Sequence, residues 1–276
     1  MSAVNELSKT KCIFGAVIAF IWLAVVLFSS MVEVGCGDES TSSIQSPATL
    51  AVTPAPATET LTLVSSSYVE DRNATDPMTI TGIRAQANQL IVVFVASDGP
   101  QETPQTIASL AGGGLHWKQA VKANSLPGDA EIWYAIPVDN VDNLTVTASR
   151  SAAGCNTGTC NGLIGVLVFS GFNLDKPIGA TGTNSSTSGP PKVSLITIGD
   201  RSWVFGVGSD WSHAEARMIA TGQIMGHDDV STENDDDYWV QYMSAPTPVA
   251  GTQVTLSDTA PLDRKINFAA VEIRQD

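Results

Sequence analysis

Histidine and basic residues are scarce in this chain, and their scarcity excludes two classes of function. The three histidines among the 276 residues, His116, His213 and His227, form no His-x-x-x-His pair, so the sequence offers no zinc site of that spacing. Lys and Arg number 14 against 28 Asp and Glu, which gives a formal charge of −14. Because an acidic surface repels phosphate groups, we expect no nucleic acid partner.

Two other patterns are missing from the sequence. A nucleophile elbow requires Gly-x-Ser-x-Gly, and the nearest stretch, residues 206–210 (GVGSD), lacks the last glycine. No stretch keeps a 3.6-residue period, although residues 212–220 could form a short helical turn. We therefore assign no catalytic residues and expect no enzyme, and a glycan hydrolase acting through two of the many acids stays an alternative.

Short apolar runs separated by Gly, Pro, Asn and Asp fill residues 61–276 and predict strands and turns. Residues 88–96 (NQLIVVFVA) and 163–170 (LIGVLVFS) are almost continuously apolar, so we expect two central strands covered on both faces. Period-two alternation in residues 144–148, 254–256 and 266–270 predicts half-buried strands. Further runs lie at residues 78–84, 115–121, 131–136, 193–198, 202–208 and 238–243.

About eleven short strands with few helices are typical of an all-β sandwich or barrel. Their number favours a β-sandwich of two packed sheets in jelly-roll order. No internal repeat is visible in the sequence, which favours one domain over residues 61–276 rather than two immunoglobulin-like modules.

The N-terminal segment predicts export. Residues 12–32 (CIFGAVIAFIWLAVVLFSSMV) carry no charge and, at about 1.5 Å per helical residue, are just long enough to cross a hydrocarbon core of roughly 30 Å. Lys9 and Lys11 precede the run, which places the N-terminus in the cytoplasm and everything after Glu33 outside. Residues 1–36 are therefore an uncleaved signal anchor, a cleaved signal peptide, or a lipoprotein signal ending at Cys36, although Glu33 departs from a lipobox.

The segment that follows has the composition of a linker. Residues 37–60 are rich in Ser, Thr, Pro and Ala and poor in large apolar side chains, so they cannot bury enough surface to fold alone. We expect a flexible spacer between a membrane and an extracytoplasmic domain, or the start of a secreted protein.

Two cysteines lie close together between predicted strands. Cys155 and Cys160 are separated by four residues, and an oxidising compartment would join them in a disulfide that fixes a local turn. No second Cys or His pair accompanies them, so a metal site is the weaker reading.

An acidic stretch, residues 226–239 (GHDDVSTENDDDYW), raises the question of a metal ion. An EF-hand loop starting at Asp229 would place Asn234 where the loop needs Gly and Val240 where it needs Glu, so that motif fails. We expect no cofactor, but a looser calcium site remains an alternative. Its ligands would be Asp228, Asp229, Asp235, Asp236 and Asp237. The simpler interpretation is a solvated acidic loop that joins a strand ending near residue 225 to a strand beginning at residue 238.

Aromatic residues suggest a binding surface. In residues 131–136 (EIWYAI), period two places Tyr134 and both isoleucines on one face, so Trp133 is expected to point outward. The same reasoning turns Trp239 outward. An exposed Trp beside polar groups can stack against a sugar ring. The predicted ligand-binding residues are Trp133, Trp239, Gln241, Asp210 and Trp211.

Several motifs are shared with a known kind of module. Residues 202–211 (SWVFGVGSDW), 238–241 (YWVQ), 255–261 (TLSDTAP) and 267–273 (NFAAVEI), together with 89–100, 112–117 and 130–133, resemble an uncharacterised extracellular β-sandwich module of bacterial secreted and surface proteins. The resemblance covers most of residues 61–276 and implies an extracellular sandwich, but it implies no catalytic residues.

Taken together, the sequence predicts a membrane-tethered or secreted extracytoplasmic module that binds a glycan or another cell-surface partner. A structural subunit of an envelope or filament assembly is the first alternative, and a glycan-degrading hydrolase is the second.

Overall fold

The computed structural model describes residues 59–275 apart from 74–75, 100–102 and 152–159. The predicted anchor or signal, residues 1–36 with Cys36, and most of the predicted linker lie outside the described residues, and so does Cys155. Within the part of the chain that is described, no helix is long and apolar enough to span a membrane. All the described residues belong to one compact unit.

The described residues form sixteen β-strands and no helix, which confirms the all-β prediction and shows that no helical turn forms at residues 212–220. The first eight strands make two antiparallel sheets. The five-stranded sheet contains, in spatial order, β1 (Thr62–Asp71), β8 (Gly162–Ser170), β3 (Leu90–Ser97), β6 (Asp129–Ala135) and β5 (Lys118–Ala123). The three-stranded sheet contains β2 (Met78–Ala85), β7 (Val141–Arg150) and β4 (Ile107–Ala111).

The second eight strands also make two antiparallel sheets. The five-stranded sheet contains, in spatial order, β13 (Gln223–Ser231), β14 (Asp236–Met243), β11 (Trp203–Asp210), β16 (Ile266–Ile273) and β9 (Ile178–Ser186). The three-stranded sheet contains β10 (Lys192–Ile196), β15 (Gln253–Ala260) and β12 (Met218–Ile219).

The two halves repeat one topology. Adding eight to each strand number of the order β1-β8-β3-β6-β5 gives β9-β16-β11-β14-β13, and adding eight to β2-β7-β4 gives β10-β15-β12. The prediction of a single pair of sheets was therefore wrong in number, because the chain contains two sandwich-like units of the same strand order. The sequence shows no repeat because the two halves share the order of their strands rather than their residues.

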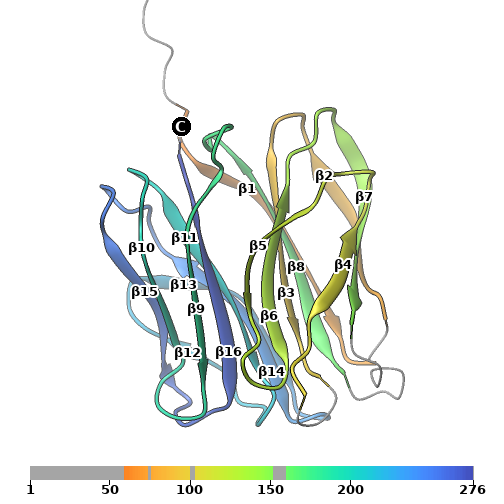
Figure 1. The fold of residues 1–276 in the computed structure, drawn as a ribbon, viewed down its shortest axis with the longest axis vertical. Helices are drawn as coiled ribbons and strands as arrows, with labels where there is room; N and C mark the ends of the chain where they lie inside the picture. Colours follow the sequence, from red (N-terminus) through yellow and green to blue (C-terminus); the bar gives the residue numbers. More distant parts are fainter. Residues whose placement is uncertain (1–58, 74–75, 100–102, 152–159, 276) are drawn as a thin grey trace, which may run out of the picture. The chain divides into compact units, whose positions relative to one another are not determined.

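Three apolar cores hold four layers together (Figure 1). The first core lies between the two five-stranded sheets and includes Phe94, Phe169 and Phe205. The second joins the five-stranded sheet of the first half to β2, β7 and β4, and the third joins that of the second half to β10 and β15. Each five-stranded sheet is thus covered on both faces, which explains the uninterrupted apolar runs in β3 and β8.

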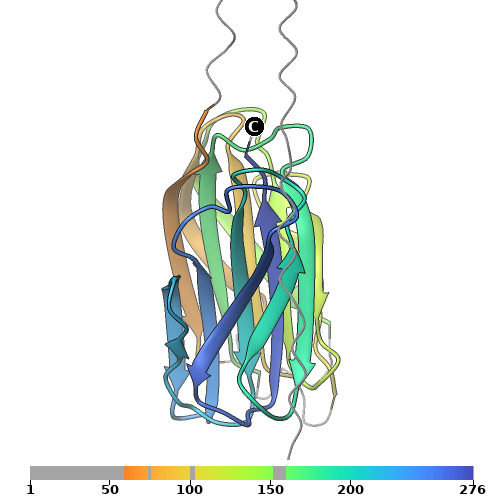
Figure 2. The ribbon, with the colours of Figure 1, turned by 90° about the vertical axis from the view of Figure 1, so that its left-hand side faces the viewer.

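The described chain begins and ends at the same end of the strands. The Gln275 side chain donates a hydrogen bond to the carbonyl oxygen of Glu59 (3.1 Å), and the strands run along the long axis of the domain (Figure 2). We call this the terminal end. The opposite end, where β3 finishes at Ser97 and β11 at Asp210, is called the far end.

Candidate functional site

The acidic stretch forms a β-hairpin at the far end rather than the predicted solvated loop. Its residues belong to β13 and β14 and to the turn at residues 232–235. Asp229, Asp236 and Asp237 are all at most 3% exposed. The loop prediction was wrong because both faces of this sheet are covered, so aspartates on either face of the hairpin can become buried.

The five aspartates proposed as calcium ligands contact four different residues. Asp228 and Asp237 contact Arg217, Asp229 contacts Arg72, Asp235 contacts His213, and Asp236 accepts from Asn161. Among the described residues, no three His, Cys, Asp or Glu side chains are arranged to hold a metal ion. The structure therefore does not bring these five residues together into one site.

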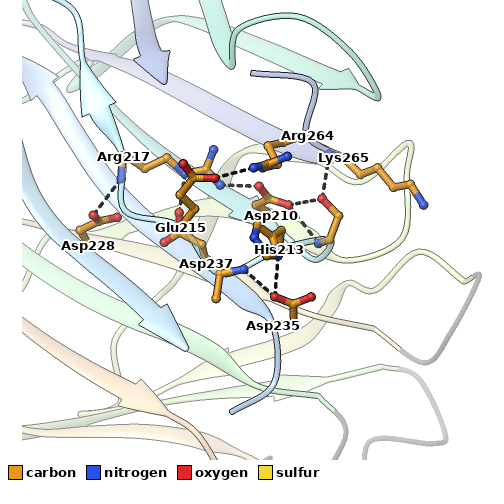
Figure 3. A network of polar contacts seen from close by, with 11 residues as sticks. Asp210, His213, Glu215, Arg217, Asp228, Asp235, Asp237, Arg264 and Lys265 are labelled. Carbon is orange, nitrogen blue, oxygen red and sulfur yellow. Dashed lines mark hydrogen bonds and ion pairs between the residues drawn. The ribbon is translucent and has the colours of Figure 1, made fainter. Parts of the chain in front are cut away.

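Arg217 is the centre of a buried ionic network, which we call the Arg217 cluster (Figure 3). It comprises Asp210, Arg217, Asp228, Asp237 and Asp258. The guanidinium donates from Nη2 to Asp210 Oδ2 (2.6 Å) and from Nε to Asp237 Oδ2, and the backbone N–H of Arg217 donates to Asp228 Oδ2 (3.1 Å). The guanidinium carbon also lies 4.1 Å from the ring centroid of Trp239. A cation of the protein itself thus occupies the middle of this acidic group.

Burial also raises the pKa of three carboxyl groups of the Arg217 cluster. Burial raises the pKa of Asp237 to about 9, against the opposing effect of Arg217, and raises the pKa of Asp258 to about 7. Burial likewise raises the pKa of Asp228. Asp210, Asp237 and Asp258 are at most 3% exposed. The cluster is therefore a buried structural network, and its carboxyl groups are not accessible to a polymeric ligand.

Both predicted ligand-binding residues on β14 are buried. Trp239 is fully buried in the third core, with its ring 5.2 Å from that of Phe268 at an interplanar angle of 64°. Gly208, opposite Trp239 on β11, leaves room for the indole, because a Cβ there would lie 2.0 Å from the Trp239 ring. Gln241 is also buried and donates to Gln223 (2.8 Å). The prediction that Trp239 and Gln241 point into solvent was wrong, because the three-stranded sheet covers that face.

Trp133 was assigned to the correct side of β6, but that side is also packed. Ile132 lies in the first core as predicted. Trp133 is half-buried against the second core, and its indole N–H donates to Glu131 Oε2 (2.7 Å). Its role in the described structure is therefore to pack and to hold Glu131.

Asp210 and Trp211 lie at the far end. Asp210 is buried, and besides Arg217 its carboxylate accepts from the backbone N–H (2.9 Å) and hydroxyl (2.6 Å) of Ser212. Trp211 is half-buried, and the Lys265 ammonium lies 4.6 Å from its ring centroid. Of the predicted ligand-binding residues at this end, only Trp211 offers part of a ring to a partner.

Cys160 is buried just before β8. Because its predicted partner, Cys155, lies outside the described residues, the Cys155–Cys160 disulfide stays a prediction.

A second buried acid pair lies in the first half, at a position that corresponds to Asp237. Asp129 faces Ser97 at the far end of β3, as Asp237 faces Asp210 at the far end of β11. Both oxygens of Asp129 lack a hydrogen bond of normal geometry, and burial followed by the charge of Glu131 raises its pKa well above the ordinary value, with Lys122 opposing. Glu131 accepts from the Thr106 hydroxyl (2.6 Å), the Ile107 N–H (3.0 Å), the Gln119 amide (2.6 Å) and the Trp133 indole (2.7 Å).

We expect Asp129→Asn to raise the free energy of unfolding at pH 9 by about 1 kcal/mol or more and to change it little at pH 5. The folded pKa of Asp129 is raised, so its stability contribution is lost as the pH rises through that value, whereas an amide stays neutral and can still donate to Glu131. Urea denaturation at the two pH values measures the effect. Equal changes in the free energy of unfolding at pH 5 and pH 9 would show that ionisation of Asp129 does not affect the stability.

Sequence reasoning missed a hollow at the terminal end, which we call the terminal hollow. Its volume is about 340 Å³, and it lies between the start of β1, the β2–β3 turn and the β6–β7 turn. It is lined by Val64, Arg84, Ala85, Gln86, Gln89, Asn140, Val141 and Asp142. These residues are scattered over three segments of ordinary polar sequence, so no local motif marks them.

Irregular strands open this hollow. The register of β1 shifts between Leu63 and Ser65, which leaves Val64 as an extra residue whose side chain is 49% exposed. The pairing of β2 with β7 shifts twice between Ile80 and Ala85, and Gly82 there has a φ of 81°. The corresponding pair in the second half, β10 and β15, runs without a shift. The β1 shift has a counterpart in the second half, where the pairing of β9 with β16 shifts between Val271 and Ile273. Only the irregular pairing of β2 with β7 is therefore specific to the wall of the hollow.

Some polar groups of the hollow fix its turns and others are free to bind. The Gln89 side chain accepts from the Gln86 N–H (2.8 Å), and the Asn140 side chain accepts from the Ala87 N–H (2.8 Å). The side chains of Arg84 and Asp142 are 81% and 85% exposed and lie only 3.8 Å apart. A pair so exposed is held weakly, which leaves a guanidinium and a carboxylate available at the rim.

Comparison of the chain with known protein families, with curated proteins and with solved structures finds no match. The resemblance to an extracellular bacterial module therefore stays an expectation from the sequence.

Proposed function

We propose that the protein is an extracytoplasmic binding module that recognises a glycan through the terminal hollow. The observation that carries the proposal is a concave site with exposed hydrogen-bonding side chains, one wall of which is formed by an irregular β2–β7 pairing that the equivalent strands β10 and β15 lack. Its volume falls near the lower end of the range for small-ligand pockets, roughly 300–1,000 Å³.

The chemistry of the hollow suits a sugar. Arg84, Gln86 and Asp142 offer both donors and acceptors, which matches a ligand whose hydroxyl groups do both. One positive and one negative side chain balance each other, so the site does not call for a charged ligand. Val64 adds an exposed apolar surface against which the C–H face of a sugar can pack.

The cellular setting is part of the proposal. The uncharged run at residues 12–32 would tether the domain to a membrane or direct its secretion. Each half would be a jelly roll in which the fifth strand has joined the sheet of the sixth, since the order 1-8-3-6 beside 2-7-4 is that of two interlocked Greek keys.

A structural subunit is the second candidate, and a surface feature favours it. Ile196, Ile198 and Val249 are each 57–60% exposed. They lie near one another, because the Thr197 hydroxyl donates to the carbonyl oxygen of Val249 (3.4 Å). An apolar group of this kind can bind another protein. A hydrolase has less support, because the carboxyls of Asp210 and Asp237 are fully buried.

We expect Arg84→Ala to weaken binding of the purified full-length protein to its best glycan on a neutral-glycan array by about tenfold, the usual effect of losing one hydrogen bond from a charged group. Arg84 is largely exposed, so the melting temperature should not change. Lys176→Ala is the matched control, since Lys176 is an exposed cation in the β8–β9 turn at the same end but outside the hollow. Equal losses in both variants, or no binding to any glycan, would contradict the proposal.

A further inference from the structure

A second hollow is also lined by residues of β1 and β2, the two strands that contribute to the terminal hollow. It has a volume of about 230 Å³ and is called the far hollow. It is lined by Val69, Glu70, Asp71, Asn73, Pro77, Met78 and Thr79. β1 supplies Val64 to the terminal hollow and Val69 to the far hollow, while β2 supplies Arg84 to the first and Thr79 to the second. The two hollows therefore lie toward opposite ends of the neighbouring edge strands β1 and β2.

The stretch between the hollows is polar and exposed. On β1, Ser65 and Ser67 have the same alternation as Val69, so they face the same side, and both are exposed. On β2, Thr79 and Thr81 are exposed as well. Val64 and Val69 are five residues apart, which corresponds to roughly 17 Å along a strand. A row of hydroxyl groups thus connects two hollows that each contain one exposed valine.

Each acid that lines the two hollows has a basic partner, although the whole chain carries −14. In the terminal hollow Arg84 faces Asp142. In the far hollow Glu70 is paired with Arg72 (3.0 Å), which Asp229 also contacts (2.6 Å), and Asp71 is paired with Arg150 (3.0 Å). A surface whose acids are paired, on a protein that repels anions, fits an uncharged ligand.

We infer that the edge formed by β1 and β2 binds an extended, uncharged polysaccharide chain that occupies both hollows at once, an inference that rests on the proposed function of the terminal hollow. The valines contact the C–H faces of sugar units at the two ends, and the hydroxyl groups between them bind the intervening units. A peptide adding to β1 as an extra strand would use backbone groups and leave the side chains of the two hollows unused.

Calorimetric titration of the full-length protein with neutral oligosaccharides of increasing length tests the inference. The probes are di-, tetra- and hexasaccharides of the cello-, chito-, malto- and laminari-series. We expect the hexasaccharide of one series to bind about tenfold more tightly than its disaccharide. Asn73→Ala in the far hollow and Ser67→Arg between the hollows should each weaken the hexasaccharide by about tenfold and leave the disaccharide unchanged, whereas Arg84→Ala should weaken both.

Gln253→Ala is the matched control for these variants, because Gln253 is an exposed amide on β15 in the other half and should change neither affinity. Binding that does not depend on length, and that only Arg84→Ala weakens, would overturn the extended site and keep the proposed function. If no series binds, both proposals fail. If an extended valine- and threonine-rich peptide binds and competes with the hexasaccharide without depending on Arg84, the edge is a peptide site instead.

Discussion

Replacing Arg217 by methionine is expected to lower the free energy of unfolding by about 3–5 kcal/mol at pH 7. Arg217 is 7% exposed, and its guanidinium contacts two fully buried carboxyl groups, those of Asp210 and Asp237. Methionine keeps much of the volume of the side-chain stem but leaves these carboxyls without a cation in a region that water does not reach. Urea denaturation followed by tryptophan fluorescence measures the loss.

The matched control is Arg264→Met. Arg264 is paired with Glu215, whose side chain is 50% exposed, so this pair should contribute at most about 1 kcal/mol. A second test uses pH, because Arg217 opposes the raised pKa of Asp237, and that pKa should rise further without the guanidinium. The difference between Arg217→Met and the wild type should therefore widen as the pH rises above about 9. If Arg217→Met lowers the free energy of unfolding no more than Arg264→Met does, the Arg217 cluster does not stabilise the fold more than an exposed ion pair.

The sequence was most informative where a strand is covered on both faces. The runs at residues 88–96 and 163–170 correspond to β3 and β8, in which nearly every residue is buried. A continuous apolar run has no other stable place in an all-β domain, so pattern alone identified these strands. β1 was missed for the opposite reason: it is an edge strand with the sequence TLVSSSYVED, and most of its side chains are exposed.

The errors at the acidic stretch came from partners that are distant in the sequence. Asp229 is paired with Arg72, which lies 157 residues away, and Asp237 with Arg217, 20 residues away. The sequence pattern of an aspartate that pairs with a buried cation is the same as that of an aspartate exposed to water. The polarity of the stretch therefore suggested a loop. For Trp239, alternation along the strand was assigned correctly, but nothing local reveals that a further sheet covers the second face.

The repeat of topology and the terminal hollow were beyond sequence reasoning for a common reason. A sandwich requires apolar residues at alternating positions and not particular residues, so β6 (DAEIWYA) and β14 (DDYWVQYM) can occupy equivalent places with little identity. The hollow depends on register shifts in β1 and β2, and a shift is a property of the pairing with β8 and β7. Only the structure compares one half with the other and shows that the pairing of β2 with β7 is irregular where that of β10 with β15 is regular.

Raising the pH from about 5 to about 9 is expected to lower the free energy of unfolding progressively. Burial raises the pKa of Asp236 to about 6, of Asp98 and Asp258 to about 7, and of Asp237 to about 9, from an ordinary value of 3.8. Between these values the folded protein binds more protons than the unfolded chain. The stabilisation is therefore complete below pH 3.8 and is lost as the pH rises through each folded pKa. The slope is up to about 1.4 kcal/mol per pH unit for each additional proton bound.

Asp98→Asn isolates one of these groups. Asp98 directly follows β3 and lies near Asp236 of the second half. Asn161 links the two, since its carbonyl oxygen accepts from the Asp98 N–H (2.9 Å) and its amide donates to Asp236 (3.3 Å). Burial raises the pKa of Asp98 first and the charge of Asp236 second, against the Gly99 N–H and Arg150. Asparagine cannot ionise, so the variant should lose less stability than the wild type between about pH 4 and pH 7.

Asp142→Asn removes the same charge from a side chain that is 85% exposed at the other end of the domain, and its pH profile should match that of the wild type. If the wild-type profile is flat from pH 5 to pH 9, or if Asp142→Asn flattens it as much as Asp98→Asn does, the buried acids do not carry the dependence. If the Asp98 variant alone flattens the profile, the protonated form of Asp98 stabilises the contact between the two halves at the far end. The protein would then be most stable in acid. Arg84 and Asp142 of the terminal hollow lie at the other end of the domain, so this titration should not change them.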